Sequence, residues 1–112
     1  MIAAWLKTLR SGRVLLVDGA TGTELRHRGI RLDAKAWSGP AALTHADVLG
    51  EIHADYLRAG AEVITANTFG TNRFVLEAAE LADRFQDINR AAVEAARRAR
   101  EKAGRSAAIA GS

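Results

Sequence analysis

Short apolar runs alternate with helical segments along the chain, and this alternation limits the fold more than any other feature. The runs at 13–17, 62–67 and 106–111 are each dominated by Val, Ile, Leu or Ala. The run at 13–17 is apolar at successive positions, which is typical of a strand buried on both faces of a parallel sheet. Strands that alternate with helical crossovers predict a parallel α/β architecture.

Helical segments are predicted around these runs, from the spacing of apolar residues and from helix-start and helix-stop residues. The predicted helices are residues 3–10, 21–28, 44–60, 72–81 and 83–102. The last of them is expected to end at Gly104 and to have an inner stripe made of Phe85, Ile88, Ala92, Ala95 and Ala99. Thr21 and Glu24 have capping-box spacing, and Thr44 is expected to cap the helix that follows it. Residues 30–44 lack periodicity and contain the only proline, so we expect an ordered excursion there.

The predicted sheet is small. With three parallel strands, both sheet edges would be open and one face of each helix would lack a partner. A sheet with open edges and uncovered helix faces is not expected to form a complete domain. We therefore expect residues 1–112 to form a single, incomplete domain of a larger α/β fold.

Composition excludes several classes of function. The chain has no cysteine, which excludes disulfides, thiolate metal sites and a Cys nucleophile within it. The net charge of +3 comes largely from a basic run near the end of the last predicted helix. We expect a solvated helix face there, or a weak anion or interface patch, and no nucleic-acid partner. No apolar stretch has the length of a membrane span or a signal-peptide core, which predicts no membrane association and a cytoplasmic protein.

Polar segments that contain glycine follow two of the predicted strands, at Asp18–Thr23 and Thr65–Gly70. In parallel α/β folds, ligands bind at the carboxyl ends of the strands. Glycine lets backbone N–H groups approach a ligand, and the N-terminus of a following helix favours an anion. The expected ligand group is therefore a carboxylate or a phosphate. The alternative is a tight strand-to-helix turn in which Asp18 acts as a cap. Walker and dinucleotide-binding motifs are absent.

The histidines do not have the spacing of a metal site. His27 and His45 lie at predicted helix ends and are expected on the surface. His53 lies beside the apolar face of its helix, where we expect a partly buried ring with satisfied hydrogen bonds. Glu51 and Asp55 belong to the same helix, away from the strand ends, and are expected in solvent.

Two long motifs can be compared with known families. The first, VDGATGTEL, covers residues 17–25, and the second, HADYLRAGAEVITANTF, covers residues 53–69, with an excursion around Trp37 and Pro40 between them. Their order and separation resemble the homocysteine S-methyltransferase family, which includes betaine-, S-methylmethionine- and methylfolate-dependent enzymes. The resemblance extends from about residue 13 to the last residue.

The resemblance implies the N-terminal part of a TIM-type (β/α)8 barrel, with about two βα units and a third strand. It also implies transfer of a methyl group from a donor to the homocysteine thiolate, giving methionine. In the family, zinc is held by three cysteine thiolates on later strands. Because this chain has no cysteine, we expect zinc in the complete enzyme but not bound by these residues. The chain alone is therefore expected to be inactive.

The resemblance also assigns substrate-binding roles. The expected homocysteine-binding residues are Asp18, Gly19, Ala20, Thr65, Asn67, Thr68 and Phe69. Asp18 and the backbone that follows it would bind the amino-acid head group. His53, Tyr56 and residues 59–61 are expected to serve packing and helix termination. No catalytic residue and no metal ligand is assigned within the chain.

Two other functions are compatible with the sequence. A non-catalytic half-barrel would act through association, because open sheet edges and helix faces can pair with a second copy or with a complementing chain. An unrelated α/β module would use the turn at Asp18 and Gly19 to bind phosphate. The methyl donor is not specified by these residues.

Overall fold

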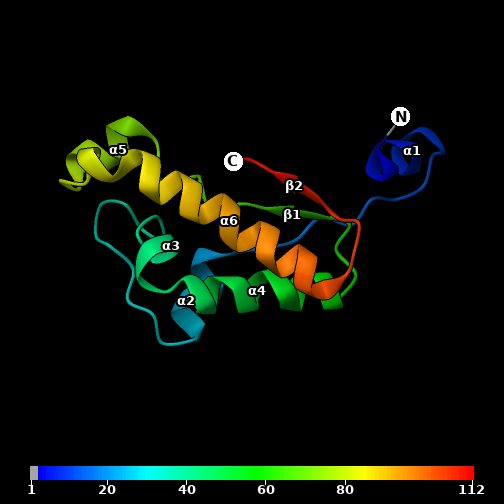
Figure 1. Ribbon diagram of the computed structural model, residues 1–112, viewed down its shortest axis with the longest axis horizontal. Helices are drawn as coiled ribbons and strands as arrows, with labels where there is room; N and C mark the ends of the chain where they lie inside the picture. The colour runs from blue at the N-terminus through cyan, green and yellow to red at the C-terminus, as the bar shows by residue number, and fades with distance from the viewer. Residues whose placement is uncertain (1–2) are drawn as a thin grey trace.

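The structure is a computed structural model that describes residues 3–112, so residues 1 and 2 of the predicted domain lie outside it. The elements follow one another as α1 (Ala4–Arg10), α2 (Gly22–His27), α3 (Ala41–Thr44), α4 (Ala46–Arg58), β1 (Val63–Thr65), α5 (Arg73–Ala78), the 3₁₀ helix η1 (Ala82–Arg84), α6 (Phe85–Ala103) and β2 (Ala108–Ala110). The described part is elongated, 45 × 27 × 21 Å, with α1 near one end and α5 near the other (Figure 1). No helix in this part is long and apolar enough to cross a membrane.

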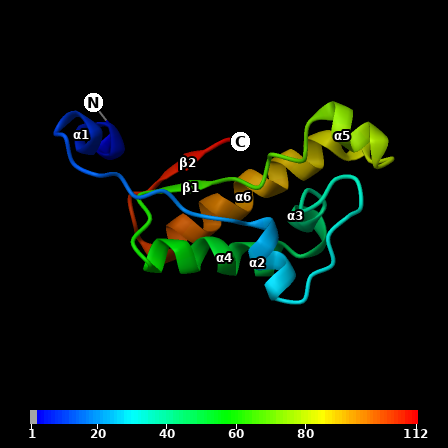
Figure 2. The same cartoon turned by 180° about the vertical axis from the view of Figure 1, so that it is seen from behind.

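A short parallel sheet lies in the middle of the molecule. β1 and β2 pair in parallel, and the extended segment before α2 joins the other edge of β1 through a parallel bridge between Val17 and Val63. The backbone N–H of Asp18 donates to the carbonyl oxygen of Val63 at 3.0 Å. Figure 2 shows the three segments side by side, in front of the helices. The predicted alternation of extended segments and helices in a parallel α/β fold is therefore confirmed.

Helices α4 and α6 cover one face of this sheet (Figures 1 and 2). Leu57 of α4 packs with Ala96 and Ala99 of α6 and with Ile64 of β1 in one buried cluster. Most of the predicted inner stripe of α6 is buried: Ile88, Ala92, Ala95 and Ala99. Because most of these side chains are alanines, the two helices can approach each other and the sheet closely.

The opposite face of the sheet is uncovered in the part of the chain that the structure describes. The prediction of a strand at 13–17 that is buried on both faces is therefore wrong. Val14 is 80% exposed and Val17 is 58% exposed, and Val17 alone in this run forms a bridge. The physical reason is that α4 and α6 lie on one side only, so the apolar pattern of the run has no second layer to pack against.

Residues 30–44 form the predicted ordered excursion, although its end is the short helix α3. Asp33 and Trp37 exchange two backbone hydrogen bonds of 2.9 and 3.0 Å, and the Asp33 carboxylate accepts the N–H of Ala36 at 2.7 Å. Trp37 has a φ of 52°, in the left-handed region that few non-glycine residues adopt. The excursion packs closely on Gly70, because an added Cβ there would lie 2.9 Å from the carbonyl oxygen of Ala36.

One predicted helix end, at a glycine, is confirmed, and two predicted helix caps, at threonines, are wrong. Gly104 ends α6 with a left-handed φ of 65°, as predicted. Thr21 has helical backbone angles and makes no side-chain cap bond. α4 begins after His45, not after the predicted cap Thr44.

Replacing Gly70 with Ala is expected to destabilise the fold by about 1–3 kcal/mol, because the added Cβ would crowd a backbone carbonyl that cannot move freely. Gly50→Ala in α4 is the matched control, because an added Cβ there meets nothing within 4 Å. Helix propensity predicts that this control is stabilised by up to about 1 kcal/mol. Urea unfolding of the 112-residue chain measures both changes. Equal stability of Gly70→Ala and the unchanged chain would contradict the close packing.

Candidate functional site

A cleft of about 630 Å³ opens at the carboxyl ends of the strand segments. Its walls come from the turn into α2, from the excursion before α3 and from the residues after β1. The predicted site residues that line it are Asp18, Gly19, Ala20, Thr65, Asn67 and Phe69. Residues far apart in the sequence are therefore brought together here, as expected for parallel strands whose carboxyl ends share one edge.

The carboxylate of Asp18 joins the two predicted strand ends. One of its oxygens accepts the backbone N–H of Thr65 at 2.8 Å, and the other accepts the Thr65 hydroxyl at 2.9 Å. Each carboxylate oxygen has a further lone pair. Asp18 is therefore oriented by the protein and can still accept a hydrogen bond from the ammonium group of a ligand.

A second pair of hydrogen bonds ties the excursion to the end of β1. The amide nitrogen of Asn67 donates to the carbonyl oxygen of Ser38 at 2.7 Å, and the amide oxygen accepts the Ser38 hydroxyl at 2.8 Å. Asn67 is buried. It therefore shapes the cleft wall by holding the excursion in place. Ser38 lies within the excursion, between Trp37 and Pro40, and no sequence pattern predicted its role.

Two aromatic rings form an apolar rim of the cleft. The ring centroids of Trp37 and Phe69 are 6.4 Å apart, at an interplanar angle of 34°. Both side chains are exposed, by 62% and 71% respectively. With the carboxylate of Asp18 in the same cleft, this rim suits a small molecule that has a cationic group and an apolar part.

The lining of the cleft differs from the predicted site at two residues, Thr68 and Arg26. Thr68 is outside the cleft lining, and its hydroxyl accepts the backbone N–H of Ser112 at 2.9 Å, beyond the end of β2. Arg26 of α2 lines the cleft and adds a positive charge. Its position near the basic end of a short helix did not predict a role in the cleft.

Tyr56 has a polar contact that the sequence analysis missed. It packs in the core as predicted, but its hydroxyl also donates to the carbonyl oxygen of Ala20 at 2.7 Å. An added Cβ on Gly19 would lie 3.0 Å from the same hydroxyl. The helical pattern predicted where the ring is buried and carried no information about the partner of the hydroxyl.

His53 is completely buried, and neither ring nitrogen has a hydrogen-bond partner among residues 3–112. The prediction of a partly buried histidine with satisfied hydrogen bonds is therefore wrong, because no polar group of this part of the chain lies within hydrogen-bond distance of the ring nitrogens. Burial lowers the pKa of His53 below its ordinary value of 6.5, and the negative charge of Asp18 opposes that shift. The fold therefore favours the neutral imidazole.

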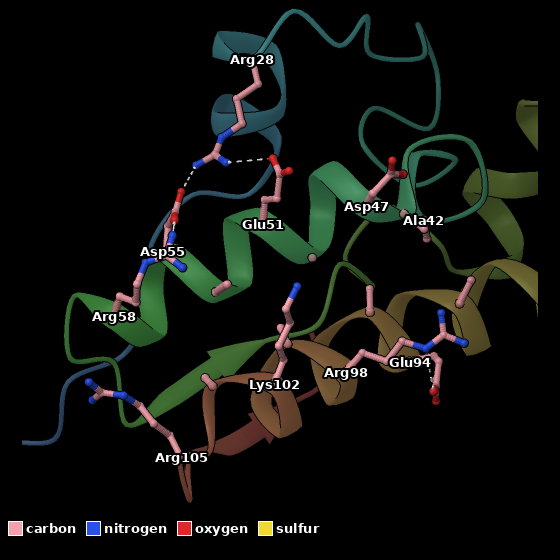
Figure 3. Close-up of a pocket in the computed structure, with 17 residues that line it drawn as sticks. Arg28, Ala42, Asp47, Glu51, Asp55, Arg58, Glu94, Arg98, Lys102 and Arg105 are labelled. Atoms are coloured by element: carbon pink, nitrogen blue, oxygen red, sulfur yellow. Dashed lines mark hydrogen bonds and ion pairs between the residues drawn. The ribbon is translucent and has the colours of Figure 1, made fainter.

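A larger hollow of about 1250 Å³ lies between α4 and α6, on the side shown in Figure 3. Alanines form much of its lining, and charged side chains stand along its edges (Figure 3). Asp55 of α4, which was expected in solvent, pairs with Arg28 of α2 at 2.6 Å. This ion pair helps to hold α2 against α4. The residues at the strand ends do not line this hollow, so the cleft beside Asp18 is the candidate site.

Within residues 3–112, no group of three or more His, Cys, Asp or Glu side chains is placed to hold a metal ion.

Comparison with known proteins assigns the chain to a family. It matches the family described as homocysteine S-methyltransferase over residues 15–112. It is 39% identical over 90 residues to homocysteine S-methyltransferase of Escherichia coli, which is 79% of this chain and 29% of that protein. It is 37% identical over 98 residues to methionine synthase of Mycobacterium tuberculosis, which is 84% of this chain and 8% of that protein. The chain thus spans less than a third of the length of either relative.

A solved structure shows the same fold. The metallated form of a homocysteine methyltransferase from Escherichia coli aligns with a TM-score of 0.79 and 29% identity. The alignment covers 95% of this chain and 40% of the other. The α/β fold therefore matches one part of a homocysteine methyltransferase.

The buried histidine predicts that the chain loses stability as the pH falls below about 6.5. Because the pKa of His53 is lowered in the fold, the unfolded chain binds this proton first, and protonation favours unfolding. The stability associated with the neutral ring is complete above the unfolded pKa and decreases as the pH falls toward the folded pKa.

His53→Leu is expected to flatten this dependence, measured as the urea midpoint from roughly pH 7 to pH 5. His27→Leu is the matched control, since the side chain of His27 is 68% exposed, and it should retain the dependence. A midpoint of the unchanged chain that does not vary with pH in this range would contradict the prediction.

Proposed function

This chain belongs to the homocysteine S-methyltransferase family, and from that premise we propose that it forms the N-terminal part of an enzyme that methylates the sulfur of homocysteine to give methionine. The observation that carries the proposal is the cleft at the strand ends. Residues from both family-like motifs converge there, with Asp18 held by Thr65 and with Phe69 at the rim. The family assignment counts against an unrelated phosphate-binding module.

We propose that residues 1–112 belong to a TIM-type (β/α)8 barrel, to which they contribute about two βα units and a third strand. The parallel order of the segment at Val17, β1 and β2 supports this arrangement. The coverage of one sheet face by α4 and α6 is also as expected, because a barrel has its helices on the outside. The uncovered face at Val17 would then face the barrel interior.

Within this proposal, the chain binds and orients homocysteine. The carboxylate of Asp18 would accept hydrogen bonds from the substrate ammonium group, using the lone pairs that Thr65 leaves free. The backbone at Gly19 and Ala20 would lie beside the head group. The aromatic rim would pack against the aliphatic part of the substrate. Binding in one defined orientation places the thiol for the reaction.

The chemistry at sulfur is assigned to residues outside this chain. A zinc site built from thiolates does not fit the residues present, since the chain has no cysteine and residues 3–112 contain no grouping of metal ligands. We propose that the zinc of the complete enzyme is held by other parts of the barrel. Zinc would supply a deprotonated substrate thiol at neutral pH.

A second candidate function is association without catalysis. The apolar side chain of Val17 favours it, because it lies on the uncovered sheet face and is 58% exposed. Such a surface is stabilised when another protein layer covers it. The layer would be a second copy of this chain or a complementing polypeptide.

The proposed function predicts that the 112-residue chain alone transfers no methyl group. A hybrid enzyme, in which residues 15–112 replace the matching segment of the Escherichia coli homocysteine S-methyltransferase, is expected to be active. Methionine formed from homocysteine and the methyl donor of the unmodified Escherichia coli enzyme is measured by mass spectrometry. Methyl transfer by the purified chain without any complementing polypeptide would overturn the assignment of the chemistry to other residues.

Two matched variants of the hybrid test the cleft. Asp18→Asn is expected to lower kcat/KM for homocysteine by about tenfold or more, because it removes the charge from a hydrogen bond worth about 1.5–3 kcal/mol. Asp83→Asn, at an exposed position in η1, is expected to retain the activity of the hybrid. The same activity in both variants would remove Asp18 from the site.

The association function predicts self-assembly that depends on the uncovered face. Sedimentation velocity should show oligomers of the isolated chain, and Val17→Lys should shift them toward monomer because it places a charge on that face. Lys7→Glu in α1, which has no buried residue, is a control for a charge change elsewhere. A stable monomer with a cooperative melt would exclude this function.

A further inference from the structure

We infer that Tyr56 is a positioning residue, which holds the turn at Asp18–Ala20 in the shape that receives the amino-acid head group. The inference rests on the proposed function, because it concerns the same cleft. Tyr56 itself lies on α4 and is not among the residues that line the cleft. It therefore acts through the turn and not by touching the ligand.

Two contacts connect Tyr56 to the turn. Its hydroxyl donates to the carbonyl oxygen of Ala20 at 2.7 Å. An added Cβ on Gly19 would lie 3.0 Å from this hydroxyl and 3.3 Å from the nearest ring carbon. Gly19 is not among the glycines with a positive φ. The close approach of Tyr56, and not the backbone angle, therefore explains why a residue without a side chain is needed there.

The ring of Tyr56 is held firmly, which makes it a suitable support. It packs against a cluster that contains Leu57 and Ile64 and against another that contains Leu25 and Ile52. Ile64 belongs to β1 and Leu25 to α2. Tyr56 therefore connects the helix layer with the sheet and with the helix that follows the turn.

The turn is held from two directions. Asp18 is bound by Thr65 of β1, and Ala20 is bound by Tyr56 of α4. A peptide unit is planar and trans, so fixing the Ala20 carbonyl also fixes the N–H of Thr21 on the opposite side of that unit. Thr21 lines the cleft. The hydroxyl of Tyr56 thereby sets the orientation of a backbone unit at the ligand.

The hydroxyl keeps its proton in this environment. Burial raises the pKa of Tyr56 above its ordinary value, as do the negative charges of Glu24 and Asp18, while Arg28 opposes the shift. The hydroxyl is therefore a hydrogen-bond donor throughout the neutral pH range. Phe at this position would fill the same space but would leave the Ala20 carbonyl without its partner.

The test compares Tyr56→Phe, Gly19→Ala and the double variant of the 112-residue chain. Tyr56→Phe is expected to shift the NMR amide resonances of residues 19–21 and to speed their hydrogen exchange. Gly19→Ala should lower the melting temperature, and less so in the Phe background, because the atom 3.0 Å from the new Cβ is gone. Ser11→Ala is the control, since it removes a hydroxyl-to-carbonyl bond of 2.7 Å in an exposed turn.

Titration with L-homocysteine, followed by NMR, separates positioning from general stability. Tyr56→Phe is expected to weaken binding about fivefold, the size of one hydrogen bond, while Ser11→Ala leaves it unchanged. The comparison is made at a temperature where every variant is folded.

Unchanged turn resonances in Tyr56→Phe, together with equal effects of Gly19→Ala in both backgrounds, would overturn the inference. So would homocysteine affinity that is the same in Tyr56→Phe and the unchanged chain. If the turn responds as expected but neither chain binds homocysteine, the control of the turn by Tyr56 is supported. In that case the chain by itself does not form the proposed homocysteine site.

Discussion

The packing of α4 and α6 on one face of a narrow parallel sheet is the constraint on which the rest of the structure depends. Alanines on α6 let the buried side chains of Leu57 and Ile64 come close to that helix, so that the two layers pack closely. Burial of this apolar surface stabilises the arrangement. Because the helices lie on one side only, Val17 on the other sheet face is exposed and could be covered by a further layer.

The same packing places the candidate site. Parallel strands bring their carboxyl ends to one edge, so Asp18 and Thr65 meet although 47 positions separate them. Tyr56, which lies in the helix layer, donates a hydrogen bond to the turn at Ala20. Ser38 of the excursion is hydrogen-bonded to Asn67, which follows β1. The cleft is thus formed by three parts of the chain, each held by a hydrogen bond to another part.

The accuracy of the sequence-based predictions depended on whether a feature is local. Glycine at the end of α6 and the inner alanine stripe were predicted correctly, because helix periodicity and a left-handed stop depend on neighbouring residues. The caps at Thr21 and Thr44 were predicted wrongly, since Thr21 already has helical backbone angles and Thr44 is the last residue of α3. The hydrogen bonds expected for His53 were also predicted wrongly, because the partners of a buried group come from other elements.

The sequence by itself determined the alternation of extended segments and helices, the two motifs of the homocysteine S-methyltransferase family and the absence of cysteine thiolates. These follow from residue identity and short-range spacing. Tertiary structure alone decided that Asp18 binds Thr65, that Tyr56 supports the turn at Ala20, and that one sheet face is uncovered. Hydrogen bonds and burial between distant segments depend on how elements pack, and a linear pattern does not carry that information.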